Sequence, residues 1–425
     1  MQLLQNQISP FSLKNTGSFT LLTYLKLPTN NLKAKYTGSS DQLRLRLIDI
    51  FRQCPNLIYL FLDICIARDL TCITAAVLKA VDYCKQLETL VISNKAEMPA
   101  TLLSWDNDIN NADQDDIIYY SYTKKKSNQR KHRRHHSNDN PSTFIATTPS
   151  SLTSSSSVPF KSKEVNNNSS SNKKERKGLT KLILDVGGLV FDFDFIDSIL
   201  QKAHKTLELF HLIGTVVPVL DNNNFYFNNN NNKRLLQRLG SYGIPNLCEL
   251  SLSACFDGDA SVEETNNGLI QFIFKCPRLQ AIRINGPGSN RVHQSLSHMR
   301  AAKKNYKLNK RTSCPLVNDQ VLEAIGTYCP LLRHLYIDGL RQHTRDGLLR
   351  FATMVGGIKR SQLVELAIDM ERKSVLTLVN ELQSLRRLTL LPSRGFYMIE
   401  LFEDRVVVQK TLINRGGELI EHTQR

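Results

Sequence analysis

Residues 314–340, CPLVNDQVLEAIGTYCPLLRHLYIDGL, contain the pattern that decides the fold. Val317 and Asp319 mark the start of a short helix, because an Asp or Asn just ahead of an apolar periodic run can cap the free N–H groups of the first turn. Apolar residues then recur at helical spacing from Val321 to Tyr328. Cys329-Pro330 ends the helix, since proline lacks an N–H and pushes the residue before it towards extended geometry.

After this proline the apolar period changes from helical to alternating. Leu332, Leu335 and Ile337 form an LxxLxL pattern, which is typical of a short strand with one buried face. One short strand and one short helix cannot bury their own apolar sides, so we expect the unit to recur. Ten copies of the pattern can be placed, at Leu22-Leu25-Leu27, Leu57-Leu60-Leu62, Leu87-Leu90-Ile92, Leu179-Leu182-Leu184, Leu207-Phe210-Leu212, Leu247-Leu250-Leu252, Leu279-Ile282-Ile284, Leu332-Leu335-Ile337, Leu363-Leu366-Ile368 and Leu385-Leu388-Leu390.

The interval between these copies predicts the fold class. Apart from two places where polar inserts intrude, the first leucines of neighbouring copies lie 22 to 40 residues apart. That interval suits one strand and one helix per turn of a leucine-rich repeat solenoid. We therefore predict an α/β horseshoe of about ten repeats, with a parallel concave sheet and convex helices. Residues 44–54 and 73–84 are two of these helices, because their apolar residues follow i, i+3, i+4 spacing.

The cysteines point to a family. Cys-Pro pairs stand just ahead of three strands, at Cys54, Cys276 and Cys329, and the segment from Cys314 to Cys329 combines two cysteines with a Val-Asn-Asp helix start. This pattern resembles the cysteine-containing leucine-rich repeat of F-box/LRR proteins. The resemblance implies the substrate-recognition part of a ubiquitin-ligase receptor in an SCF complex, with a protein substrate, a Skp-type adaptor and a cullin as partners. Residues 1–18 show no F-box motif, so we expect a binding module alone.

Polar, low-complexity segments divide the chain. We predict N-terminal repeats over 1–104, a disordered basic and Ser/Asn-rich insert over 105–178, and C-terminal repeats over 179–425 with flexible loops at 221–233 and 286–313. The insert has too few apolar residues to offset the entropy of ordering it. Near the C-terminus, the run RVVVQKTLI at 405–413 has a strand-like composition.

Charge and cysteine usage limit the location and the partners. The net charge is +16, and most of it lies in residues 105–178 and 286–315. The basic clusters at 124–134 and 173–177 leave open an alternative function, a nuclear or nucleic-acid-associated scaffold. No secretory signal or apolar span of about 18 residues is found, so we expect no membrane association and a cytoplasmic or nuclear location. We therefore expect the nine cysteines to be small buried thiols.

The third and fifth positions of LxxLxL should point off the sheet, away from the helices. Aromatic, Arg and His side chains at such positions have the composition of a protein-binding surface. The other interpretation is that some of them pack against one another across strands or are covered by loops. The predicted partner-binding residues are Tyr59, Phe61, Lys181, His211, Arg283, His334, Tyr336 and Arg387.

Catalytic and metal sites find little support. No phosphate-binding loop, nucleophile-elbow or kinase motif is present. Asp192, Asp194 and Asp197 stand at a predicted helix start, where acidic residues are favoured by the helix dipole. His293 and His298 are five residues apart and would not share a helix face. We therefore predict no enzyme activity, no cofactor and no metal.

Overall fold

The structure of the chain is a computed structural model. It describes residues 21–28, 40–63, 70–93, 178–217, 235–257, 262–286, 312–313, 317–339, 342–357, 362–392 and 402–422. The predicted insert at 105–178 and loops at 221–233 and 286–313 lie outside these ranges, apart from residues 178, 286 and 312–313. The two basic clusters and His293 and His298 also lie outside them. Residues 1–105 and 176–425 form one compact unit, separate from residues 106–175.

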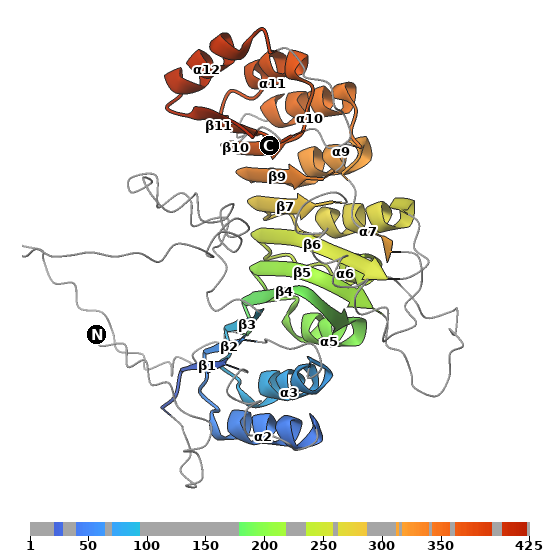
Figure 1. The fold of residues 1–425 in the computed structure, drawn as a ribbon, viewed down its shortest axis with the longest axis vertical. Coiled ribbons are helices and arrows are strands. Elements are labelled where there is room, and N and C mark those ends of the chain that lie inside the picture. The colour runs from blue at the N-terminus through green and yellow to red at the C-terminus, as the bar shows by residue number, and fades with distance from the viewer. Residues whose placement is uncertain are drawn as a thin grey trace, which may run out of the picture. The chain divides into compact units, whose positions relative to one another are not determined.

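The described part of this unit is an α/β arrangement resembling a solenoid, in which strand–helix units stack side by side (Figure 1). Eleven parallel strands form one sheet, in which each strand pairs with the next described parallel strand along the chain. They are β1 (Tyr24–Pro28), β2 (Tyr59–Asp63), β3 (Thr89–Ser93), β4 (Lys181–Asp192), β5 (Leu209–Val217), β6 (Glu249–Asp257), β7 (Ala281–Asn285), β9 (His334–Asp338), β10 (Glu365–Ile368), β11 (Arg387–Leu390) and β12 (Glu418–Glu421).

The described helices lie on one side of the sheet (Figure 1). A short 3₁₀ turn at Arg372–Ser374 leads into one of them. The helices are α2 (Ser40–Gln53), α3 (Leu70–Tyr83), α5 (Phe193–Ala203), α6 (Leu235–Tyr242), α7 (Val262–Phe274), α9 (Asp319–Tyr328), α10 (Arg345–Gly357), α11 (Val375–Glu381) and α12 (Arg405–Asn414).

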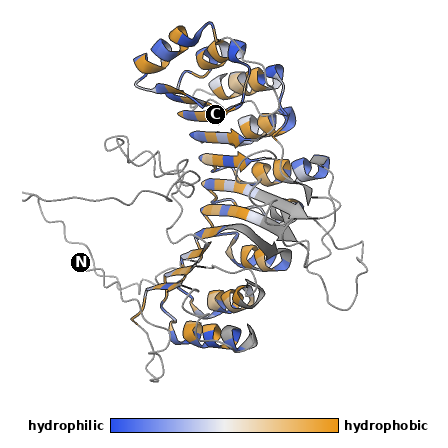
Figure 2. Ribbon diagram, viewed as in Figure 1, coloured by the Kyte–Doolittle hydropathy of each residue, from blue (hydrophilic) through white to orange (hydrophobic). Residues whose placement is uncertain are grey.

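All ten LxxLxL patterns coincide with strands, so this part of the prediction is confirmed. The apolar positions of the pattern face the helices and join one continuous core. Leu60, Leu90 and Leu335, for example, are at most 1% exposed. Figure 2 shows the alternation as orange and blue bands along the strands.

The helix predicted within 314–340 is also confirmed. Helix α9 starts at Asp319, and the Asn318 side chain accepts a hydrogen bond from the backbone N–H of Val321 at 3.0 Å. The helix ends at Tyr328, and Cys329 is its C-cap residue, directly ahead of the proline. The predicted helices at 44–54 and 73–84 match α2 and α3, except that Cys54 and Cys84 directly follow the helices.

The strand-like interpretation of residues 405–413 is wrong, because this run is helix α12. Val408 and Leu412, one turn apart, are buried in the core, and this tertiary packing outweighs the strand preference of the consecutive valines. After the helix, Gly416 has φ 74°, and the N–H groups of Gly416 and Gly417 donate to the carbonyls of Ile413 and Leu412. Glycine in this left-handed position is a common helix terminator.

Three further features were not predicted. Strand β12 follows α12 and pairs with β11, and β8 (Thr312–Ser313), at the end of the predicted loop 286–313, pairs antiparallel with β6. Strands β4, β5 and β6 also continue well past the LxxLxL pattern, to Asp192, Val217 and Asp257. The sheet therefore extends further than the ten repeated patterns indicate.

Candidate functional site

The sheet has a second face, opposite the described helices, and we call it the open face. It is defined by the third and fifth positions of the LxxLxL patterns and the paired positions of β12. Because neighbouring strands pair in constant register, these positions form two continuous rows. The third-position row runs from Tyr24 to Glu418, and the fifth-position row runs from Lys26 to Ile420. All eight residues predicted to bind a partner lie in these rows.

The strands β1 to β5 give this face an aromatic and apolar character. The rings of Tyr24 and Tyr59 stack with their centroids 4.5 Å apart, and Tyr24 is 52% exposed. Lys26 Nζ lies 4.8 Å from the centroid of the Phe61 ring, in the distance range of a cation–π contact. The two rows carry no Asp or Glu on these five strands, whereas Lys26 and Lys181 are exposed.

A small apolar cluster lies on the same strands. Phe61, Val91, Ile183 and Leu209 are 0–5% exposed and pack together, with Tyr59 against them. Phe61 was predicted to be an exposed partner contact, and the structure shows it buried in this cluster instead. Apolar side chains on adjacent strands lie close enough to bury one another, which agrees with the alternative of cross-strand packing.

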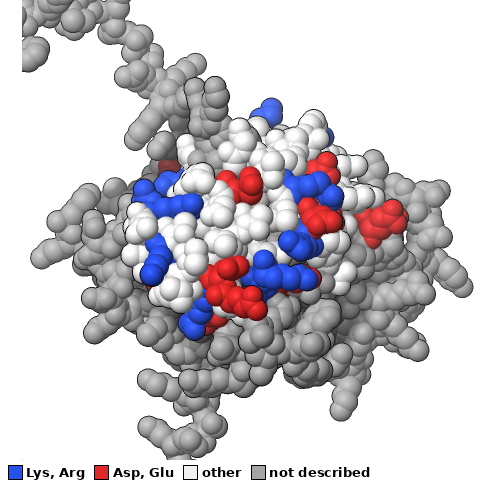
Figure 3. All heavy atoms as spheres, turned by 90° about the horizontal axis from the view of Figure 1, so that it is seen from above, with Lys and Arg blue, Asp and Glu red and all other residues white. Residues whose placement is uncertain are grey.

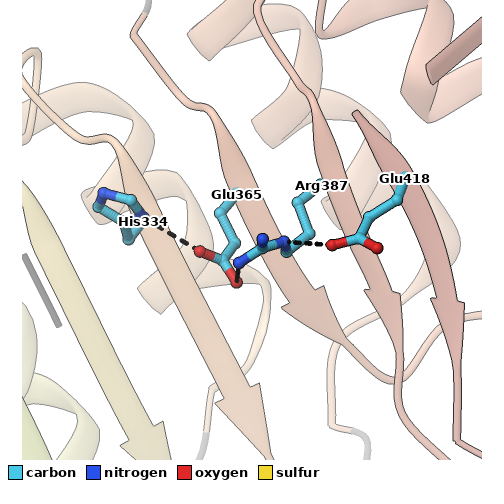
Figure 4. Close-up of polar contacts among 4 residues, drawn as sticks. All are labelled: His334, Glu365, Arg387 and Glu418. Atoms are coloured by element: carbon cyan, nitrogen blue, oxygen red, sulfur yellow. Dashed lines mark hydrogen bonds and ion pairs between the residues drawn. The ribbon is translucent and has the colours of Figure 1, made fainter. Parts of the chain in front are cut away.

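The strands β9 to β12 carry a row of polar contacts, which we call the ion-pair row (Figure 4). His334 Nδ1 lies 3.2 Å from Glu365 Oε2. Arg387 Nη1 lies 3.7 Å from Glu365 Oε1, and Arg387 Nε donates to Glu418 Oε1 at 2.8 Å. These four residues share one register position on four successive strands, so the sheet itself aligns their side chains.

Burial within the ion-pair row decreases towards β12. The side chains of His334 and Glu365 are 7% and 12% exposed, while those of Arg387 and Glu418 are 27% and 54% exposed. An exposed pair such as Arg387–Glu418 contributes about 0–1 kcal/mol, because water screens both charges. The buried pair His334–Glu365 therefore holds the side chains of the row in place. Arg387 and Glu418, at the other end, are accessible to a ligand.

Two more polar contacts lie between these regions. His211 Nε2 lies 2.6 Å from Glu249 Oε1, and both side chains are almost fully buried. The Arg283 guanidinium lies 4.7 Å from the centroid of the Tyr336 ring, which occupies the same register position on the next strand. Arg283 and Tyr336 both remain partly exposed.

The predicted partner-binding residues thus divide by exposure. Tyr59, Arg283, Tyr336 and Arg387 are partly exposed and Lys181 is exposed, whereas Phe61, His211 and His334 are buried. The sequence located all eight on one face through the period of the strands. It did not indicate the His211–Glu249 contact, because these residues are 38 positions apart and lie diagonally across two strands.

No group of three or more His, Cys, Asp or Glu side chains in the described ranges is arranged to hold a metal ion. The Asp197 carboxylate accepts hydrogen bonds from Gln201 on α5 and from Tyr242 on α6, so it joins two helices. None of the described helices is both long and apolar enough to cross a bilayer.

The cysteines whose side chains the structure describes are buried or partly buried free thiols. Cys54, Cys84, Cys276 and Cys329 are buried and free. The Cys84 thiol donates to the Cys54 carbonyl oxygen at 3.3 Å. Burial raises the pKa of Cys54 to about 11 and the pKa values of Cys84 and Cys276 to about 12, because the thiolate would lose its hydration.

Comparisons with known proteins give little further information. The sequence matches no protein family and no curated protein. Among solved structures, the chain is similar to one described as the crystal structure of the Rad7 and Elc1 complex in yeast, with 12% sequence identity and a TM-score of 0.12. That match covers 52% of this chain and 79% of the other.

Proposed function

We propose that this chain is a protein-binding module that holds a segment of a partner protein on the open face. The observation that carries the proposal is the continuous open face itself. Its exposed Tyr and Lys side chains lie on β1 to β4, and its exposed or partly exposed charged and aromatic side chains lie on β7 to β12. Aromatic and Arg side chains are the residue types that most often dominate binding at protein interfaces.

The proposed partner segment is acidic and apolar where it meets β1 to β4. Lys26 and Lys181 are exposed there, and the two rows hold no acidic residue on these strands. A carboxylate on the partner would meet these lysines, and its apolar side chains would meet Tyr24 and Tyr59. Towards β12 the ion-pair row presents both signs of charge, which suits polar contacts at the other end of the segment.

The test is affinity purification of the full chain from its own cells, followed by mass spectrometry. We expect Lys181→Glu, which reverses an exposed charge on the open face, to lower recovery of the main partner at least several-fold. The matched control is Lys79→Glu, because Lys79 is an exposed lysine on helix α3. Equal recovery with both variants would reject the open face as the binding surface.

The same experiment tests a narrower proposal, that the module resembles the substrate-recognition part of an F-box/LRR ubiquitin-ligase receptor. The repeated pattern and its cysteines support it. Recovery of a Skp-type adaptor together with a cullin would support this narrower proposal. A partner recovered without either protein would reject the ligase role and leave the binding module. The alternative nuclear or nucleic-acid-associated function depends on basic residues outside the described ranges.

A further inference from the structure

A pocket of about 360 Å³ opens where the chain leads into strands β9 to β12. Its lining residues lie directly before a strand or in the turn between a helix and a strand. None of them belongs to the eight residues predicted to bind a partner, so the site is independent of the proposed function. They are Arg333, Gln362, Val364, Gln383, Ser384, Arg386 and Arg415.

All the charged residues that line this pocket are basic. Three of the seven residues are arginines, two are glutamines, and none is acidic. Over the end of the molecule that carries α12, Figure 3 shows basic and acidic side chains interspersed, whereas no acidic residue lines the pocket. A pocket that holds several positive charges close together, with no carboxylate in its lining, favours binding of an anion.

The sheet holds two of these arginines at a fixed separation. The backbone N–H of Val364 donates to the Arg333 carbonyl at 2.8 Å, and that of Arg386 donates to the Val364 carbonyl at 2.9 Å. Arg333 and Arg386 therefore flank Val364, about 10 Å apart at the backbone, which is two strand spacings. Arginine side chains are long enough to converge on one group above Val364.

The third arginine is fixed by a different set of contacts. Arg415 Nη1 donates to the carbonyls of Val379 and Leu382 at 3.0 and 2.9 Å, at the end of helix α11. Its Nη2 donates to Gln383 Oε1 at 3.3 Å. Desolvation lowers the pKa of Arg415, and a bound anion would offset that penalty.

The three arginines of the pocket differ in exposure, since Arg333 and Arg415 are only partly exposed. Arg386 is exposed, and within the described part of the chain its side chain has no ion pair. A guanidinium presents parallel N–H groups that match two oxygens of a phosphate or carboxylate. A phosphomonoester carries about −1.5 to −2 charges and three acceptor oxygens, against a single charge for a carboxylate. Three guanidinium groups therefore match a phosphate better.

We propose that the pocket formed by Arg333, Arg386 and Arg415 is a binding site for a phosphomonoester group. Arg386 and Arg333 hold the phosphate oxygens from two sides, and the amide of Gln362 donates a further hydrogen bond. Arg415, held by α11, supplies positive charge at the wall. The phosphate belongs either to a small molecule or to a phosphorylated side chain of a peptide.

The test is calorimetric titration of the full chain at low ionic strength with inorganic phosphate, a phosphoserine peptide, the same peptide without phosphate, and acetate. We expect one or both phosphate probes to bind and the other two not to. Arg386→Gln should weaken binding about tenfold or more, because it removes charged hydrogen bonds to the ligand. Gln362→Glu, which adds a negative charge at an exposed position, should weaken it similarly.

The matched control is Arg345→Gln, since Arg345 is exposed on α10 and does not line the pocket. Binding of inorganic phosphate would identify the free anion as sufficient, and binding of the phosphopeptide alone would identify a peptide-linked phosphate. Three results would overturn the site: no binding of either probe, equal binding of acetate, or equal weakening by Arg386→Gln and Arg345→Gln. Equal weakening would assign the signal to the overall positive charge of the chain.

Discussion

Gly347 shows how a single residue sets the distance between two neighbouring strand–helix units. Asp319 at the start of α9 accepts hydrogen bonds from the backbone N–H and the hydroxyl of Thr344, at 2.7 and 2.6 Å. The Thr344 hydroxyl in turn caps α10 by accepting from the Gly347 N–H at 2.9 Å. A Cβ atom at position 347 would collide with the Asp319 carboxylate. Only glycine leaves room for this contact.

We therefore predict that Gly347→Ala destabilises the protein by about 1–3 kcal/mol, because the overpacked atom displaces Asp319. In an unobstructed helix the same change would stabilise by up to about 1 kcal/mol. Gly357→Ala is the matched control, since it lies at the end of the same helix with no atom within 4 Å of the added carbon. Urea unfolding measures both variants. A Gly347→Ala variant as stable as Gly357→Ala would contradict the packing described here.

At the residue scale, the sequence predicts which side chains are buried where burial follows the periodicity of a strand or helix. It does not predict contacts between residues that are far apart in the chain. The core leucines follow from the LxxLxL spacing, because alternation alone decides which face of a strand is buried. Gly347 has no such signal, since its contact with Asp319 spans 28 positions of the chain. The burial of Phe61 could not be predicted from the period for a similar reason. The period places its side chain on one face of the sheet, but its exposure depends on the neighbouring side chains on that face.

At the scale of elements, the helix termini differ in how they are capped. The Asn318 side chain caps α9 through the Val321 N–H, whereas Asp404, at the equivalent position of α12, makes no capping hydrogen bond with its side chain. The N-terminal N–H groups of a helix lack partners within the helix, so a capping oxygen stabilises it directly.

We predict that Asn318→Ala lowers the free energy of unfolding by about 0.5–2 kcal/mol, which is the usual cost of losing a cap. Asp404→Ala should change it by less than about 0.5 kcal/mol, as expected for a surface substitution without a specific contact. Denaturant titration of both variants against the wild-type chain is the measurement. Equal losses would show that the capping hydrogen bond of Asn318 adds no stability beyond that of an N-cap residue without one.

Helices α9 and α12 also show which sequence features predict a helix and its ends reliably. The start and end of α9 could be predicted because the capping residue and the proline act locally. The run at 405–413 was interpreted as a strand because it contains three consecutive valines, which favour strands. The structure buries only Val408 and Leu412 of this run, and their spacing of four residues fits one face of a helix. The glycines at 416 and 417 were the available signal, since they follow the run at the position where helices commonly end.

At the scale of the whole described unit, the sheet continues across the gap between residues 93 and 178. Strand β3 pairs with β4 in the same register as its neighbours, from Thr89 with Lys181 to Ser93 with Asp185. One apolar core likewise includes residues from Leu25 to Leu412. The recurring LxxLxL pattern on both sides of the insert made this continuity predictable, because a long surface connection adds only a slowly growing entropic cost.

This continuity predicts how the unit unfolds. Cys54 and Cys84 lie before the insert, and Cys276 and Cys329 lie after it; all four are buried. Burial raises the pKa of each thiol, so at pH 8 the folded protein holds very little of the reactive thiolate. If the two segments share one sheet and one core, all four thiols should become reactive at the same urea concentration.

The measurement is labelling with iodoacetamide across a urea series at pH 8, with each cysteine followed by peptide mass spectrometry. We expect a single midpoint for the four sites, since a shared interface between β3 and β4 couples the stabilities of neighbouring repeats. Full labelling in high urea controls for intrinsic thiol reactivity. An earlier midpoint for Cys54 and Cys84 would mean that the interface contributes too little to join the segments, because each would then unfold at its own stability.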